Sequence, residues 1–169
     1  MIRSWKGKTP QVHPTAFVSE AAYVVGEVDI GENSSVWPGT VVRGDRGKIT
    51  IGKGSNIQDN CTIHSDAPAR IGDGCTLGHG VIWHGRLLGD HCLVGNGATA
   101  NDGVEVGELS VIGAGAVVLE NVKVPPRSLV MGIPGKVKGQ TTERHHEMIK
   151  SLAAHYVEEA RGYKREGLE

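Results

Sequence analysis

The sequence predicts an all-β protein, a parallel β-helix followed by one C-terminal α-helix. Three observations carry this prediction. Aliphatic residues recur every six positions from Val12 to Val130, a period that fits neither an α-helix nor simple strand alternation. Glycine makes up 25 of the 169 residues, about twice the usual ~7%, and it often follows the aliphatic position. Aromatic residues make up only 4%, which suits a tightly wound repeat better than a bulky globular core.

Each six-residue unit is expected to form one short strand and a turn, with glycine relieving backbone strain at the turn. The first position of the unit is occupied in order by Val12, Val18, Val24, Ile30, Val36, Val42, Ile51, Ile57, Ile63, Ile71, Leu77, Trp83, Leu88, Val94, Ala100, Val106, Ile112, Val118, Val124 and Val130. Three extra residues follow the Val42 unit, two follow the Ile63 unit, and one is missing before Leu88. Because no unit can bury its apolar face alone, the stacking of units makes the core.

The fifth position of the unit carries small residues, and the three cysteines, Cys61, Cys75 and Cys92, all fall there. They form no C-x-x-C pair, and their odd number argues against a disulfide framework or a zinc ribbon. We therefore expect small thiols that point into the core.

Tandem units of this kind resemble the hexapeptide-repeat proteins, in which three units make one coil of a triangular prism. That resemblance also implies a left-handed helix, against the usual crossover rule. We expect the prism domain to cover residues 1–140, with its repeat ending near Pro134-Gly135, and a C-terminal helix domain to cover residues 141–169. The helix is predicted from about Thr142 to Arg165 and packs on the prism or on a neighbouring copy. Its apolar stripe is formed by Met148, Leu152, Tyr156, Ala160 and Tyr163.

Charge and hydropathy exclude several classes of partner. Eighteen Lys and Arg residues against nineteen Asp and Glu residues give a net charge of -1, so no nucleic acid or other polyanion is expected. No apolar run approaches the ~18 residues of a membrane helix, so no membrane is expected. The first residues contain charges but no apolar signal region. The sequence therefore favours a cytoplasmic protein.

Two histidines fall into one vertical column of the expected prism. Arg43, His64 and His84 each occupy the second position of a unit, and these units begin three apart, as does the unit that contains Asn101. Side chains three units apart stack, with neighbouring coils about 4.8 Å apart. His79 is the third residue of its unit, one face earlier, so it points round the corner and away from the other two.

This arrangement predicts a metal site that one chain cannot complete. Two imidazoles about 4.8 Å apart can both reach one cation at ~2.0–2.1 Å. A cyclic three-fold assembly would bring the His79 face of one prism against the His64 and His84 face of the next. Three neutral histidines with an open fourth position are the ligand set of a catalytic zinc. We therefore expect a homotrimer with a metal site at each interface.

Four motifs resemble the γ-class carbonic anhydrases over most of the chain: RGD at 43–45, NIQD at 56–59, His64, and GHGVIWHG at 78–85. The resemblance implies that His64 and His84 of one subunit and His79 of the next bind zinc or ferrous iron. It also implies a lyase activity, the reversible hydration of CO₂ to bicarbonate by a metal-bound hydroxide at the subunit interface, since bound metal lowers the pKa of its water toward ~7.

The same resemblance assigns roles to further residues. Gln58 corresponds to a glutamine that orients the hydroxide or the substrate. Arg43 and Asp45 correspond to an intersubunit ion pair that shapes the pocket, although a purely structural role fits this pair equally well. Tyr156 corresponds loosely to a tyrosine near the active site, and core packing explains it equally well.

The chain departs from the family pattern in the residues that export protons. Arg46 stands where the archetypal enzymes carry a glutamate next to the aspartate, and their long acidic loop is absent, so the chain resembles the shorter bacterial branch of the family. Ala67 occupies the expected shuttle position, which leaves Asp66 as the nearby carboxylate. Hydration needs proton export, so the sequence predicts weak or buffer-dependent turnover.

Two other functions stay open at this level. Many hexapeptide-repeat proteins transfer acyl groups from coenzyme A with one interface histidine as base, so an acyltransferase or a thioesterase acting on acyl-CoA is the first alternative. Three histidines at ligand spacing are superfluous for that chemistry. The second alternative is a non-catalytic trimeric scaffold with a vestigial metal site.

Overall fold

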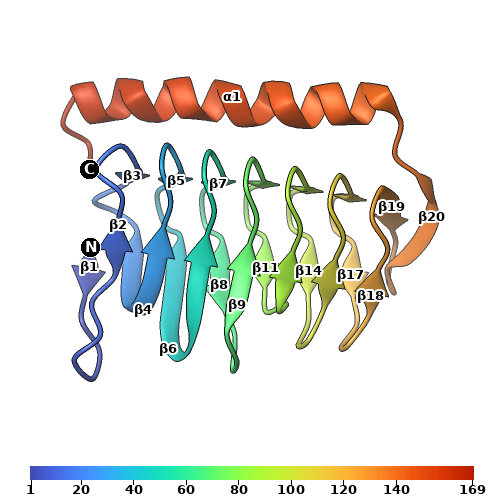
Figure 1. Ribbon diagram of the computed structural model, residues 1–169, viewed down its shortest axis with the longest axis horizontal. Coiled ribbons are helices and arrows are strands. Elements are labelled where there is room, and N and C mark those ends of the chain that lie inside the picture. Colours follow the sequence, from blue (N-terminus) through green and yellow to red (C-terminus); the bar gives the residue numbers. More distant parts are fainter.

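A computed structural model describes all residues, 1–169. The chain winds into a left-handed parallel β-helix, as the resemblance implied, and a single long helix, α1 (Glu143–Arg165), runs back along the prism (Figure 1). Nearly all neighbouring strands pair in parallel, one coil above the next. The strands form the three faces of the prism.

The first face is called the histidine face, because His64 ends one of its strands. It consists of β1 (Ile2–Arg3), the first parts of β4 (Tyr23–Ile30) and β6 (Val41–Ile51), β8 (Thr62–His64), β11 (Ile82–Trp83), β14 (Thr99–Ala100) and β17 (Val117–Val118). The second face consists of β2 (Gln11–Val12), the remaining parts of β4 and β6, β9 (Ala69–Ile71), β12 (Leu87–Leu88), β15 (Glu105–Val106) and β18 (Lys123–Val124).

The third face is called the helix face, because α1 packs against it. It consists of β3 (Phe17–Val18), β5 (Ser35–Val36), β7 (Asn56–Ile57), β10 (Thr76–Leu77), β13 (Leu93–Val94), β16 (Val111–Ile112), β19 (Ser128–Met131) and β20 (Lys136–Gln140). β20 pairs antiparallel with β19. The repeat therefore ends near Pro134-Gly135 as predicted, and a reversed strand, which the periodicity did not predict, closes this end of the face.

The predicted core positions fill the interior. Every first position of the repeat is buried except Val12, which is partly buried against the same core. The register Ile57↔Leu77↔Val94 stacks these side chains from coil to coil. The three cysteines are buried and free, as expected, and burial raises the pKa of the Cys61 thiol to about 11.

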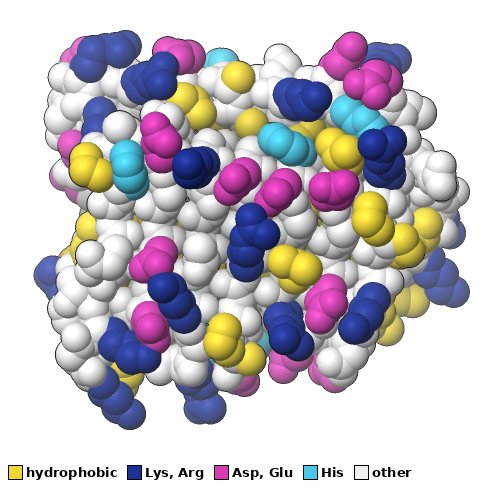
Figure 2. Space-filling model, in the orientation of Figure 1, with side chains coloured by type: hydrophobic (Ala, Val, Ile, Leu, Met, Phe, Trp, Pro, Cys, Tyr) yellow, Lys and Arg dark blue, Asp and Glu magenta, His cyan; other side chains and the backbone are white.

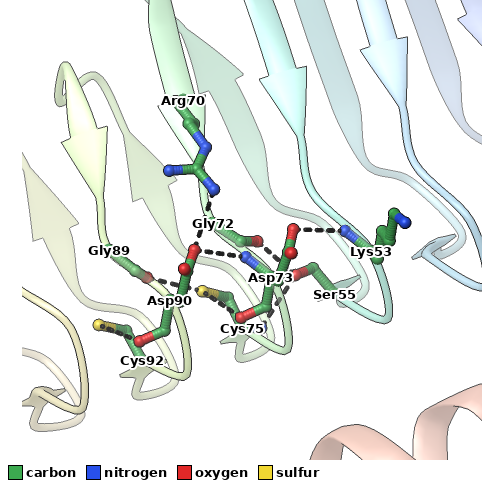
Figure 3. Close-up of polar contacts among 9 residues, drawn as sticks. All are labelled: Lys53, Ser55, Arg70, Gly72, Asp73, Cys75, Gly89, Asp90 and Cys92. Carbon is green, nitrogen blue, oxygen red and sulfur yellow. Dashed lines mark hydrogen bonds and ion pairs between the residues drawn. The ribbon is translucent and has the colours of Figure 1, made fainter.

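Polar ladders tie the corners of successive coils together (Figure 3). The Asp73 carboxylate accepts the backbone N–H of Lys53 at 2.9 Å, and the Asp90 carboxylate accepts that of Asp73 at 2.9 Å. Inside the corner, the Cys75 thiol donates to a carbonyl of the next coil at 3.1 Å. The Cys92 thiol, one coil further on, makes the same kind of contact at 3.2 Å. Each coil thus satisfies polar groups of its neighbour, which offsets the cost of burying them.

Helix α1 begins after Thr142, close to the predicted start, and ends at Arg165 as predicted. Its predicted apolar stripe is wrong at Met148, which is 44% exposed. Ala160 is buried as predicted, and Tyr163, although 37% exposed, packs edge-on against the rings of Phe17 and Trp37. The stripe omitted three buried side chains, His146, Ile149 and Ala153.

The surface carries both signs of charge, interspersed rather than separated (Figure 2). On the second face, Lys48 Nζ lies 2.6 Å from the Asp29 carboxylate, and Arg70 lies 3.0 Å from Asp90. This pairing agrees with the near-zero net charge. Helix α1 is too polar to cross a membrane.

Candidate metal centre

The column predicted from the repeat is present on the histidine face. Arg43 pairs in register with His64, and Ile63 pairs with Trp83, so His64 and His84 lie one above the other in successive coils. Their ring centroids are 4.8 Å apart, the spacing of neighbouring strands. The regular stacking of coils therefore brings two imidazoles from different parts of the sequence to one place.

The two rings face each other through nitrogens. His64 Nδ1 lies 2.8 Å from His84 Nε2. His64 is 7% exposed and His84 is partly buried. A nitrogen pair at this distance needs a proton or a cation between the two atoms, because two lone pairs repel each other.

A carboxylate lies against the other nitrogen of each ring. His64 Nε2 is 3.0 Å from Asp45 Oδ1 in a hydrogen bond, and the buried Nδ1 of His84 lies against the Asp102 carboxylate, although not at a hydrogen-bonding angle. Asp45 also accepts a hydrogen bond from Arg43 at 2.7 Å. A carboxylate on one ring nitrogen fixes the proton there and leaves the other nitrogen as a ligand.

Local electrostatics favour the protonation states that a metal needs. Burial lowers the pKa of His64, and the nearby Arg43 charge lowers it further. Burial alone would raise the pKa of Asp45, but hydrogen bonds from Arg43 and His64 bring it below its ordinary value. At neutral pH the site therefore presents a neutral imidazole and an ionised carboxylate, as metal-ligating histidines require.

The donor set fits a divalent cation. One ligand atom from each of His64, Asp66 and His84 lies within 4.8 Å of the others. Two nitrogens on one tetrahedral zinc are about 3.3 Å apart, so the 2.8 Å pair needs to open only slightly. Imidazole nitrogen with carboxylate oxygen is a donor set that suits zinc and ferrous iron.

His79 lies elsewhere, as predicted. It follows β10 at the corner between the helix face and the histidine face, it is 51% exposed, and it does not belong to the cluster above. Its Nδ1 lies 2.9 Å from Asp59 Oδ2. His79 therefore resembles the other two histidines in having one ring nitrogen against a carboxylate, but its other nitrogen makes no hydrogen bond within the chain.

Two further predicted residues lie near this corner. Gln58, in the coil before His79, is 4% exposed, and its amide donates a hydrogen bond to Asn56 Oδ1 at 3.1 Å. Tyr156 of α1 packs edge-on against Trp37, with ring centroids 5.4 Å apart. Burial raises the pKa of the Tyr156 hydroxyl, and the Asp59 charge raises it further.

The predicted site residues thus form two separate groups on one chain. Arg43, Asp45, His64, Asp66 and His84 lie on or beside the histidine face. Gln58, His79 and Tyr156 belong to the helix face and its corner.

Sequence reasoning missed two carboxylates, Asp59 and Asp102, which contact His79 and His84. A signal existed for Asp59, because it occupies the same repeat position as His79 one coil earlier. Asp102 gives a weaker signal: it lies one residue after Asn101, which continues the histidine column. The sequence also did not indicate that His146 is buried, with its Nε2 2.9 Å from Thr141 Oγ1.

Comparisons with known proteins bear on this geometry. A family model described as the hexapeptide repeat of succinyl-transferase matches residues 48–82 and 87–120. The chain is 40% identical over 166 residues to a carbonic anhydrase of Geobacillus kaustophilus, an alignment that covers 97% of this chain and 91% of that protein. It is also 37% identical over 158 residues to the mitochondrial γ carbonic anhydrase 2 of Arabidopsis thaliana.

The chain belongs to the γ-class carbonic anhydrase family. The Arabidopsis alignment covers 89% of this chain but only 57% of the plant protein, so the chain spans little more than half of that relative. A solved structure from Bacillus cereus, provisionally named an acetyltransferase, has a TM-score of 0.94 and 37% identity, and covers 98% of this chain and 97% of that one. The γ-carbonic anhydrase family and hexapeptide-repeat proteins named as transferases therefore share this prism.

Proposed function

We propose that this protein is a metal-dependent carbonic anhydrase that reversibly hydrates CO₂ to bicarbonate. One observation carries the proposal: three histidines each have one nitrogen against a carboxylate, and two of them turn their other nitrogens toward each other at 2.8 Å. That pattern orients imidazoles as metal ligands. The family membership of the chain supports the same activity.

The site requires a second copy of the chain. The pair His64 and His84 needs a third imidazole, and His79 is 51% exposed with a free nitrogen at the next corner of the prism. A cyclic homotrimer joins such a face to such a corner three times, which gives one site per interface. Ile82 of β11, two residues before His84, is 49% exposed on the histidine face and offers an apolar contact for the interface.

A zinc or ferrous ion, when bound by these three histidines, supplies a Lewis acid that lowers the pKa of a bound water toward ~7. The residues of the chain hold the ion and orient its ligands and the substrate. Asp45 fixes the proton on Nε2 of His64 through a hydrogen bond, and the Asp102 carboxylate lies against Nδ1 of His84. Arg43 keeps Asp45 ionised through its 2.7 Å hydrogen bond. Gln58 and Tyr156 arrive with His79 from the neighbouring copy, and the Gln58 amide has one donor left for the substrate.

Removal of protons is the weak step of the proposed reaction. Asp66 is the exposed carboxylate beside the imidazole pair, and its side chain is 58% exposed, so it can pass a proton to solvent. Arg46 lies 3.4 Å from Asp66 and holds this carboxylate in an exposed ion pair that competes with proton transfer. Ala67 cannot carry a proton. Turnover therefore depends on added buffer as the proton acceptor.

The experiment is a stopped-flow CO₂ hydration assay on chain purified without chelators, with metal content measured in parallel. His64→Ala and His84→Ala should abolish hydration and reduce bound metal. His155→Ala, an exposed histidine on α1, is the matched control and should change neither. A chain that holds one metal and hydrates CO₂ no faster than His64→Ala at any buffer concentration contradicts the proposal.

An acyl-CoA acyltransferase is the second candidate, since the Bacillus cereus structure of the same fold is named as an acetyltransferase. That chemistry needs a base and a coenzyme A site rather than three oriented imidazoles. Calorimetric titration with coenzyme A separates the two: tight binding by metal-free chain favours the acyltransferase or a thioesterase. Neither coenzyme A binding nor hydration, with a metal still bound, favours a scaffold with a vestigial site.

A further inference from the structure

Asp66 occupies a loop that the repeat does not require. Two residues beyond the six-residue period separate Ile63 from Ile71, and the resulting segment, 65–68, joins β8 to β9. The segment returns the Asp66 carboxylate to the histidine column, where its oxygen, a His64 nitrogen and a His84 nitrogen lie within 4.8 Å of one another. A third donor atom therefore stands beside the imidazole pair within the same chain.

The Asp66 carboxylate is free to turn toward a cation. Its ion-pair partner is Arg46, at 3.4 Å, and both side chains are more than half exposed, at 58% and 68%. Exposed ion pairs of this kind are weak, because water screens them. The two imidazoles, by contrast, are held in place, because a carboxylate lies against the outer nitrogen of each ring. Their inner nitrogens face each other.

We propose that Asp66 is a metal ligand of the separate protomer, which takes up a divalent transition-metal cation through His64, Asp66 and His84. This inference rests on the metal site proposed above. In the assembled protein, His79 of a second copy takes the position of the carboxylate, and Asp66 returns to Arg46 and to solvent. Two imidazoles and a carboxylate form a complete donor set for zinc or ferrous iron in other proteins.

Metal binding and assembly of the subunits are then two separate steps. A site built only from His64 and His84 would hold a cation weakly until a neighbour arrived. With the carboxylate included, loading needs one chain, and assembly exchanges an oxygen ligand for a nitrogen ligand. The exchange alters the coordination sphere, so visible absorption of Co²⁺ can report it independently of any activity.

The test titrates the full chain with Co²⁺ and follows visible absorption and heat, with zinc competition for affinity. His79→Ala, which removes the ligand from the neighbouring copy, should still bind one Co²⁺ per chain, with a spectrum different from that of the wild type. Adding Asp66→Asn should weaken binding by at least about 10-fold, because loss of a ligand costs at least as much as loss of a ligand's hydrogen-bond partner.

The matched control is Arg46→Gln in the same His79→Ala background. It breaks the same ion pair as Asp66→Asn but keeps the carboxylate, so its Co²⁺ affinity should be unchanged or higher. Asp66→Glu should restore part of the binding lost in Asp66→Asn, which shows that the lost binding reflects the carboxylate and not a misfolded loop. Circular dichroism melting confirms that each variant is folded.

Two results overturn the inference. A folded His79→Ala chain that binds no Co²⁺ shows that the protomer has no site of its own. Equal affinities of His79→Ala with and without Asp66→Asn show that the carboxylate is not a ligand. In both cases the wild type still binds Co²⁺, so the proposed function stands. A wild type that binds no Co²⁺ and no zinc overturns both.

Discussion

Asp45→Asn should weaken metal binding without removing a ligand. The Asp45 carboxylate accepts the Nε2 proton of His64 at 3.0 Å, which leaves Nδ1 as the ligand atom. An amide in its place can donate instead of accept, and can therefore favour the opposite tautomer. The change should reduce zinc affinity because the ring then presents a proton where the cation must bind.

The structure places the effect at the upper end of its usual range. Loss of a partner that orients a metal ligand costs 10- to 100-fold in affinity, as a rough range. Where water can replace the lost partner, the smaller value applies. The His64 side chain is only 8% exposed, so water replaces Asp45 poorly, and we expect about 100-fold, or about 2.7 kcal/mol.

The assay is a zinc competition titration against a chromophoric chelator, with two matched variants. Asp73→Asn makes the same chemical change in a corner turn, where the side chain accepts a backbone N–H, and it should leave zinc affinity unchanged. Arg43→Gln removes the other partner of Asp45 but keeps the His64 hydrogen bond, so it should cost less than tenfold, a rough figure. Equal zinc affinities for Asp45→Asn and wild type would refute the reasoning.

Three further predictions concern the prism. Leu77→Ala should lower the free energy of unfolding by about 2–5 kcal/mol, because Leu77 is fully buried in a central coil. Leu119→Ala, at a position that is 49% exposed, should cost far less. Thermal denaturation of both variants checks this. Because burial raises the pKa of Cys61 to about 11, its thiol stays protonated between pH 6 and pH 9. Iodoacetamide should therefore label the buried cysteines in urea but not in the native chain, as detected by mass spectrometry. Rapid labelling of the native chain would contradict their burial. Chelation should abolish hydration but leave the circular dichroism spectrum unchanged, because the core contains no metal ligand; unfolding on chelation would show that the metal has a structural role instead.

The sequence by itself determined the repeat, and through it much of the site. A period of six fixes which residues point inward, because every unit repeats the same backbone path. Counting units therefore stacked His64 on His84 and turned His79 to another corner, and the structure has both features. The inward cysteines and the helix that follows the prism came from the same pattern.

The features that do not repeat could be read only from the folded chain. The Asp59 and Asp102 contacts depend on side-chain rotamers, and the approach of Asp66 depends on the path of a segment outside the period. The buried side of the first turns of α1 depended on packing against the prism, since Met148 and Ile149 are both apolar and only Ile149 is buried. Periodicity fixes the position of a backbone, whereas these contacts depend on how neighbouring side chains fill the space around it.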